Sequence, residues 1–131
     1  MRKVIRTSGA PRPRGVYSQA IVDGGFVFVA GQGAVNPVTN RLDLGDIRYE
    51  TRRAIENIRA ILMAAGCSLG DVVRVGVFLA DIKDFDAMNE VYRKFFPADP
   101  PARTTVGAQL AGIKIEIDCI ARLPKTCRSR G

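Results

Sequence analysis

The sequence contains no histidine and no tryptophan, and only three cysteines among its 131 residues. The absence of histidine excludes Ser-His-Asp and Cys-His nucleophiles, histidine-ligated metals and histidine acid–base pairs. The spacing of Cys67, Cys119 and Cys127 matches no zinc-binding pattern, and their odd number favours reduced thiols with structural or incidental roles. The sequence therefore predicts no metal-binding site.

Long apolar runs are also absent. No run approaches the roughly 20 residues that a membrane-spanning helix needs, and the first 15 residues contain no apolar stretch of signal-peptide length. Hydrophobic residues make up 47% and charged residues 25% of the chain, which is typical of globular proteins in water. We predict a cytoplasmic protein without a membrane partner. One domain is expected over residues 1–122, followed by a disordered basic tail over residues 123–131.

Acidic residues are missing from both ends of the chain, and the formal net charge of the whole chain is +7. Nine of the 20 Lys and Arg residues lie in residues 1–14 and 122–131, which leaves 11 basic residues against all 13 acidic ones in the body. Basic ends can attract nucleic acid nonspecifically, but segments of this kind are more often solvated tails. We therefore predict no specific nucleic-acid partner.

The first half of the chain has the pattern of a hairpin followed by a helix. In residues 17–31, two apolar runs flank Asp-Gly-Gly at positions 23–25, which is a strong hairpin signal. Over residues 46–65, apolar side chains recur at three- and four-residue steps and predict one buried stripe. Asp46 is the expected N-cap of this helix, and Gly66 stands at its C-terminal end.

The second half predicts strands around another helix. Residues 72–80 form an apolar strand, and Asp84 is expected to cap a helix over residues 85–96. Further strands are predicted around residues 104–109 and 113–122. The order hairpin, helix, strand, helix, strands indicates an α+β sandwich with one mixed β-sheet and two helices on one face.

The second face of that sheet is expected to be apolar as well. Two helices can cover only one face, yet residues 72–80 and 26–30 carry apolar side chains on both. Because the chain offers no further helix, the simplest cover for the other face is another copy of the chain. We therefore expect a homo-oligomer.

Two charged residues are the leading site candidates. Arg103 follows a proline-rich loop and leads into a strand. Its guanidinium is suited to bind a carboxylate or phosphate. The alternative is that Arg103 is an ordinary surface residue. Glu116 is expected on the face opposite Ile115 and Ile117, where a half-buried carboxylate can position water or form a salt bridge.

Three further positions are weaker candidates. Tyr17 opens the hairpin, and its hydroxyl can orient a substrate or relay a proton, or the residue is a core or interface tyrosine. Gly31 permits close approach of a ligand to the backbone, although a turn explains it equally well. Asn89 interrupts the apolar stripe of the second helix and either contacts a substrate or faces solvent.

Several collinear segments together resemble one family, the Rid family of YjgF-type reactive-intermediate (imine) deaminases, also named L-PSP endoribonucleases. The similarity runs from about Gly15 to Ala121. The segments that carry it are Gly15-Val16-Tyr17-Ser18-Gln19-Ala20, Phe28-Val29-Ala30-Gly31-Gln32, Thr51 to Gly66, Val77-Phe78-Leu79-Ala80-Asp81, Asp84-Phe85 with Asn89, Pro101-Ala102-Arg103 and Ile115-Glu116-Ile117.

The resemblance implies a chorismate-mutase-like homotrimer whose sites lie in clefts between subunits. It implies hydrolysis of 2-imino and enamine acids, such as 2-aminoacrylate, to 2-keto acids and ammonia without a cofactor. By position, Arg103 matches the arginine that binds the substrate carboxylate, and Glu116 matches the acid that holds the attacking water. Tyr17, Gly31 and Thr105 match residues that line the site.

Three departures from the family pattern leave the substrate open. Ala30 stands where the active deaminases usually carry serine, Val16 stands where the family often has proline, and the stretch from Arg103 to Glu116 is shorter. A larger substrate such as aminomuconate is one alternative to the 2-aminoacrylate type, and a noncatalytic trimer that senses a keto acid is another. RNA cleavage ranks last because the sequence has no histidine.

The oligomer is the first testable prediction. We expect a trimer in dilute buffer, because the central strands are apolar on both faces while the chain has helices for one. Light scattering of the purified protein measures this directly. A stable monomer of 14.2 kDa would contradict it, together with every site placed between subunits.

Overall fold

Within residues 2–125, which are those that the computed structural model describes, six strands form one mixed sheet in the order β1-β2-β3-β6-β4-β5. The β4–β5 pair is parallel and the other pairs are antiparallel. Cys127 and most of the predicted tail lie outside the described residues. The elements are β1 (Lys3–Ile5), β2 (Ala20–Asp23), β3 (Phe26–Gln32), α1 (Ile47–Ala64), β4 (Val72–Leu79), α2 (Phe85–Phe95), β5 (Ala102–Gly107) and β6 (Ile115–Arg122).

The predicted hairpin is confirmed as the pair β2–β3. Its two turn residues, Gly24 and Gly25, have φ values of +60° and +85°, which glycine adopts without steric cost and which match the twist of a tight hairpin. The short edge strand β1 was not predicted, because three residues between basic side chains carry too little of an alternating pattern.

Helix α1 also follows the prediction. The side chain of Asp46 accepts a hydrogen bond from the backbone N–H of Tyr49 at 2.9 Å, and Gly66 follows the helix with a φ of +86°. The predicted apolar stripe is buried. Two polar residues, Glu50 and Asn57, are buried with it, although the sequence pattern had not singled them out.

Helix α2 begins at the predicted residue, but the capping hydrogen bond before it comes from a different side chain than expected. Asp84 occupies the N-cap position, as predicted, but its side chain makes no capping hydrogen bond. The capping hydrogen bond lies one short turn earlier, where the Asp81 side chain accepts from the backbone N–H of Lys83 at 2.9 Å and starts the 3₁₀ turn Ile82–Asp84. This turn leads directly into α2, so the chain needs no second cap.

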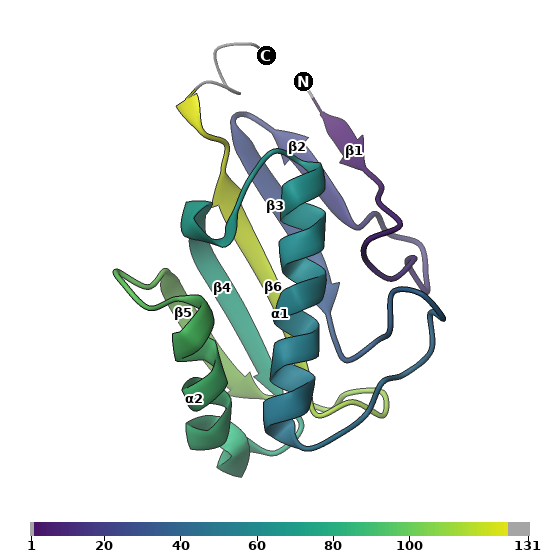
Figure 1. Cartoon of the computed structure of the whole chain (residues 1–131), viewed down its shortest axis with the longest axis vertical. Helices are drawn as coiled ribbons and strands as arrows, with labels where there is room; N and C mark the ends of the chain where they lie inside the picture. The colour runs from purple at the N-terminus through teal and green to yellow at the C-terminus, as the bar shows by residue number, and fades with distance from the viewer. Residues whose placement is uncertain (1, 126–131) are drawn as a thin grey trace.

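Both helices cover the same face of the sheet (Figure 1), as the sequence predicted. Strand β6 alternates, with Ile115, Ile117 and Cys119 buried under the helices. On the opposite face, three large apolar side chains are 36 to 44% exposed: Phe26, Phe28 and Val106. No helix in the described part of the chain is long and apolar enough to cross a bilayer.

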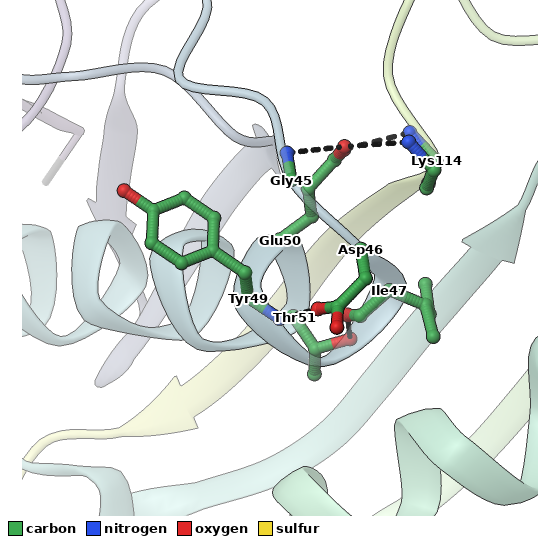
Figure 2. A network of polar contacts seen from close by, with 7 residues as sticks. All are labelled: Gly45, Asp46, Ile47, Tyr49, Glu50, Thr51 and Lys114. Atoms are coloured by element: carbon green, nitrogen blue, oxygen red, sulfur yellow. Dashed lines mark hydrogen bonds and ion pairs between the residues drawn. The ribbon is translucent and has the colours of Figure 1, made fainter.

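A buried carboxylate ties the start of α1 to the segment that precedes β6 (Figure 2). Glu50 is fully buried, and its carboxylate accepts from the backbone N–H groups of Gly45 at 3.2 Å and Lys114 at 2.8 Å. The Lys114 ammonium adds an ion pair at 3.3 Å. Two backbone donors and one cation satisfy the charge, so Glu50 fixes the position from which β6 begins.

This network gives a stability prediction. Glu50→Ala removes a fully buried side chain and leaves two partly buried backbone N–H groups without their acceptor, so we expect the free energy of unfolding to fall by about 2–4 kcal/mol. Lys114→Met should cost only about 1 kcal/mol, because its ammonium is half exposed and the backbone bond remains. Urea denaturation of both variants measures the difference. Equal losses would show that the ion pair, and not the backbone bonds, holds the segment.

Candidate functional site

Three of the predicted site residues line one cavity of about 160 Å³. Tyr17 comes from the loop before β2, Gly31 from the end of β3, and Glu116 from the start of β6. Although far apart in sequence, they meet because β3 and β6 are neighbouring strands. A cavity of about this size can hold part of a small organic ligand.

The approach of Gly31 to Glu116 requires a glycine. Between Val29 and Gln32 the pairing with β6 shifts by one residue, and this bulge brings Gly31 under the Glu116 side chain. A Cβ atom built on Gly31 would lie 2.5 Å from Oε2 and 2.8 Å from Cδ of Glu116. The Glu116 carboxylate therefore occupies the volume that a side chain at position 31 would take.

The environment of Glu116 favours its protonated form. As predicted, its side chain lies on the face opposite Ile115 and Ile117. Burial raises the pKa of the Glu116 carboxyl, and the nearby charge of Asp118 raises it further. Within residues 2–125 the carboxylate forms no hydrogen bond or ion pair, so it is available to a ligand or water.

Tyr17 contributes a hydroxyl that is held in place. Its oxygen accepts a hydrogen bond from the backbone N–H of Arg14 at 3.1 Å. The side chain is 50% exposed, so it is neither a core tyrosine nor free of contacts. Because the oxygen is used as an acceptor, the hydroxyl proton can be donated to a bound molecule.

Two buried amides hold the loops around the cavity, and neither was predicted. The Gln19 side chain accepts from the backbone N–H of Thr7 at 2.8 Å and donates to the carbonyl of Pro11 at 2.9 Å. Asn57 donates from α1 to the carbonyls of Gly33 at 3.2 Å and Val35 at 2.9 Å. A polar residue interrupting the stripe of α1 was a usable signal for Asn57, whereas nothing in the local pattern distinguished Gln19.

Arg103 lies on the helix-covered side of the edge strand β5. It pairs with Val75 of β4, whose side chain belongs to the core. Its guanidinium lies 4.6 Å from the ring centroid of Tyr92 and 5.6 Å from that of Phe85, both on α2. Stacking on two aromatic rings fixes the plane of the guanidinium, and its Nη1 donates to the sulfur of Met88 at 3.9 Å.

Thr105 and Asn89 accompany Arg103. Thr105 follows two residues later on β5, facing the same side, and Asn89 lies half-buried on α2 one turn from Phe85 and Tyr92. Among the described residues, the hydroxyl of Thr105 is buried without a hydrogen-bond partner. Burial raises the pKa of Tyr92, while the charge of Arg103 and its hydrogen bond to the Tyr92 hydroxyl oppose the rise. An unpaired hydroxyl beside a cation suits a polar ligand or a partner's polar groups.

The six predicted residues thus form two separate groups. Tyr17, Gly31 and Glu116 surround the cavity, and the Glu116 side chain lies on the face that no helix covers. The second group, comprising Arg103, Thr105 and Asn89, lies under and beside α2 on the other face. One copy of the chain does not bring the two groups together.

The described cysteines are not suited to catalysis. Cys67 and Cys119 are both buried and free of disulfides. Burial raises the pKa of the Cys119 thiol to about 12, so it carries no thiolate at neutral pH. Nucleophilic chemistry at Cys119 is therefore excluded, in agreement with the structural role expected from the sequence.

Comparison with known proteins identifies relatives over nearly the whole described length. A family model described as Endoribonuclease L-PSP matches residues 7–123. A RutC family protein of Pyrococcus horikoshii is 49% identical over 123 residues, covering 92% of this chain and 98% of the relative. A rat protein named 2-iminobutanoate/2-iminopropanoate deaminase is 42% identical over 123 residues, covering 92% and 90%.

A solved structure agrees with the fold. A protein of unknown function of the conserved Rid family from Yersinia pestis superposes with a TM-score of 0.90 at 35% sequence identity. The match covers 94% of this chain and 100% of the other. The two helices and the mixed sheet are therefore the arrangement of that family.

The contact between Gly31 and Glu116 yields a prediction. In Gly31→Ala the new methyl group must displace the end of the Glu116 side chain, which is flexible. We expect the carboxylate to leave the cavity in a crystal structure of the variant. Because no backbone needs to move, the free energy of unfolding should change by less than about 1 kcal/mol. An unmoved carboxylate or an unfolded variant would contradict this.

Proposed function

We propose that this chain, which belongs to the endoribonuclease L-PSP family of Rid and RutC proteins, is a hydrolytic deaminase. Its substrates would be reactive 2-imino and enamine acids of the 2-aminoacrylate type, and its products 2-keto acids and ammonia. The observation that carries the proposal is the carboxylate of Glu116, which faces a cavity without a cation partner among the described residues. The deaminase name of the rat relative supports it.

The proposed reaction uses Glu116 to move one proton. The carboxylate accepts a proton from water as the water oxygen attacks C2 of the protonated imine. The resulting carbinolamine receives this proton on nitrogen, and the C–N bond breaks with its electron pair leaving on ammonia. The departing ammonia takes the proton of the carbinolamine hydroxyl and leaves as ammonium, so that C2 becomes the ketone. A raised pKa suits this role, because it makes the carboxylate a stronger base that takes the proton from water more readily. Tyr17 can donate its hydroxyl proton to the substrate.

In this proposal the second group of residues comes from a neighbouring copy. Arg103 binds the substrate carboxylate through its planar pair of N–H groups, and Asn89 and Thr105 add polar contacts. Because these residues lie on the other face from Glu116 within one chain, the complete site needs two subunits. A cytoplasmic homotrimer with three clefts provides this arrangement. The apolar side chains on the open face support such an assembly.

Glu116→Gln separates catalysis from binding. The amide keeps the shape of the side chain but cannot accept the proton of water, so hydrolysis should slow by roughly 10²–10⁴. Binding of a 2-keto acid should persist, because Arg103 would hold the carboxylate. Ammonia release from 2-aminoacrylate, made in situ by a dehydratase, measures turnover, and calorimetry measures binding. Unchanged turnover with a dissociating trimer would instead assign Glu116 a structural role.

The pH dependence of the wild-type protein follows from the same group. The reaction needs ionised Glu116, and burial raises its pKa above the ordinary value of 4.5. Activity should therefore fall as the pH is lowered through this raised pKa, at a higher pH than an exposed glutamate would give. The acid limb should be absent from the residual activity of Glu116→Gln. An acid limb that persists in this variant would assign the titration to another group.

Arg103→Lys tests the carboxylate-binding role. Lysine keeps the charge but loses the planar pair of donors and the stacking on Tyr92. The transition state should lose about 1.5–3 kcal/mol of stabilisation, which lowers kcat/KM tenfold or more. Wild-type activity in this variant would contradict the role.

Mixing two inactive variants tests whether sites are shared. In randomly assembled mixtures of Arg103→Ala and Glu116→Gln subunits, about a quarter of the interfaces regain both wild-type residues. We expect activity to return to that level. If the mixture stays inactive although mass spectrometry shows mixed trimers, both residues act within one subunit or not in one site.

A further inference from the structure

Two arginines lie at the same cavity as Glu116 and Tyr17. Arg12 and Arg14 belong to the Pro-Arg-Pro-Arg segment before β2, and both line the cavity. Both are exposed. Within residues 2–125 neither forms an ion pair with a carboxylate. The cavity therefore carries two cations that no acidic side chain of the described chain neutralises.

The segment that carries them is held in place by Asn40. The backbone N–H of Arg12 donates to Oδ1 of Asn40 at 2.8 Å, and Nη2 of Arg14 donates to its carbonyl at 2.7 Å. The N–H of Arg14 donates to the Tyr17 hydroxyl at 3.1 Å. The Arg14 guanidinium uses one of its donors in this way, and the others remain available. Its position is thus fixed before any ligand arrives.

The other end of the segment is equally restrained. Buried Gln19 donates to the carbonyls of Pro11 at 2.9 Å and Thr7 at 3.0 Å. Pro11 and Pro13 fix their own φ angles on either side of Arg12. A ligand that binds these arginines therefore loses little of its binding free energy to ordering of the loop.

The arginines do not serve to neutralise Glu116. The pKa of that carboxyl is raised by burial and by Asp118, and neither arginine lowers it. Glu116 and the two guanidinium groups line one cavity without pairing. The space between them suits a molecule with its own negative charge at the arginine end.

We propose that Arg12 and Arg14 form a second anion subsite, so that the preferred substrates are dicarboxylic 2-imino acids. The inference rests on the proposed deaminase function, in which Arg103 of a neighbouring copy binds the carboxylate next to the imine carbon. Arg12 and Arg14 then bind the carboxylate at the far end of the side chain. The reaction at C2 is unchanged, because the distal carboxylate takes no part in it.

The test compares two substrates that differ in one carboxylate. An amino-acid oxidase produces 2-iminoglutarate from glutamate and 2-iminobutanoate from 2-aminobutanoate, and the rate of imine loss gives kcat/KM for each. We expect Arg12→Gln with Arg14→Gln to lower the ratio of kcat/KM for 2-iminoglutarate to that for 2-iminobutanoate by about tenfold or more. Arg52→Gln is the matched control, because Arg52 is exposed on α1 and lines none of the described cavities.

Binding of the products gives a readout that does not need turnover. Calorimetry should show 2-oxoglutarate binding about tenfold or more tightly than 2-oxobutanoate, with the preference lost in the double variant and kept in Arg52→Gln. The single variant Arg12→Gln, whose side chain has no hydrogen bond or ion pair to lose within residues 2–125, should lower the preference if the double variant does not fold.

The two proposals can fail separately. Hydrolysis of both imines without a preference for the dicarboxylic one, or an equal loss on both substrates in the double variant, overturns the second anion subsite and leaves the deaminase function. An arginine-dependent preference for 2-oxoglutarate without hydrolysis of either imine supports the subsite and contradicts the deaminase. No preference and no hydrolysis overturn both.

Discussion

The packing of one face of β6 against the two helices is the constraint on which the rest of the structure depends. Ile115, Ile117 and Cys119 are buried beneath α1 and α2, and side chains of a strand alternate between faces. Glu116 must therefore lie on the uncovered face, whatever its own preference for water. A shift of one residue in register would expose three apolar side chains and bury the carboxylate in the core.

The same alternation divides the candidate site. On β5, Arg103 and Thr105 share the core-facing side with Val75 and Val77 of β4, so they point away from the face that carries Glu116. Stacking of the Arg103 guanidinium on Tyr92 and Phe85 holds it there. A site that uses both charged residues must be assembled between copies of the chain, and the proposed function depends on this geometry.

Buried polar side chains give the cavity its fixed shape. Glu50 anchors the start of β6, Gln19 anchors the N-terminal loop, and Asn57 anchors the loop after β3. Each makes hydrogen bonds to backbone groups of a segment distant in sequence, and such bonds are costly to lose when buried. Gly31 completes the arrangement by leaving the volume that the Glu116 carboxylate occupies.

Turn glycines and hydrophobic periodicity act over a few residues, so the amino-acid pattern alone predicts the hairpin, both helices and the face of Glu116. It also singled out Tyr17, Gly31 and Glu116, which meet at one cavity. Three features depend instead on the packing of the folded chain: Arg103 lies apart from these residues, the capping hydrogen bond before α2 comes from Asp81 and not Asp84, and Arg12 and Arg14 reach the cavity. These outcomes depend on which strands are neighbours and which loops are held by Gln19 and Asn40, and contacts between distant segments leave no periodic pattern in the chain.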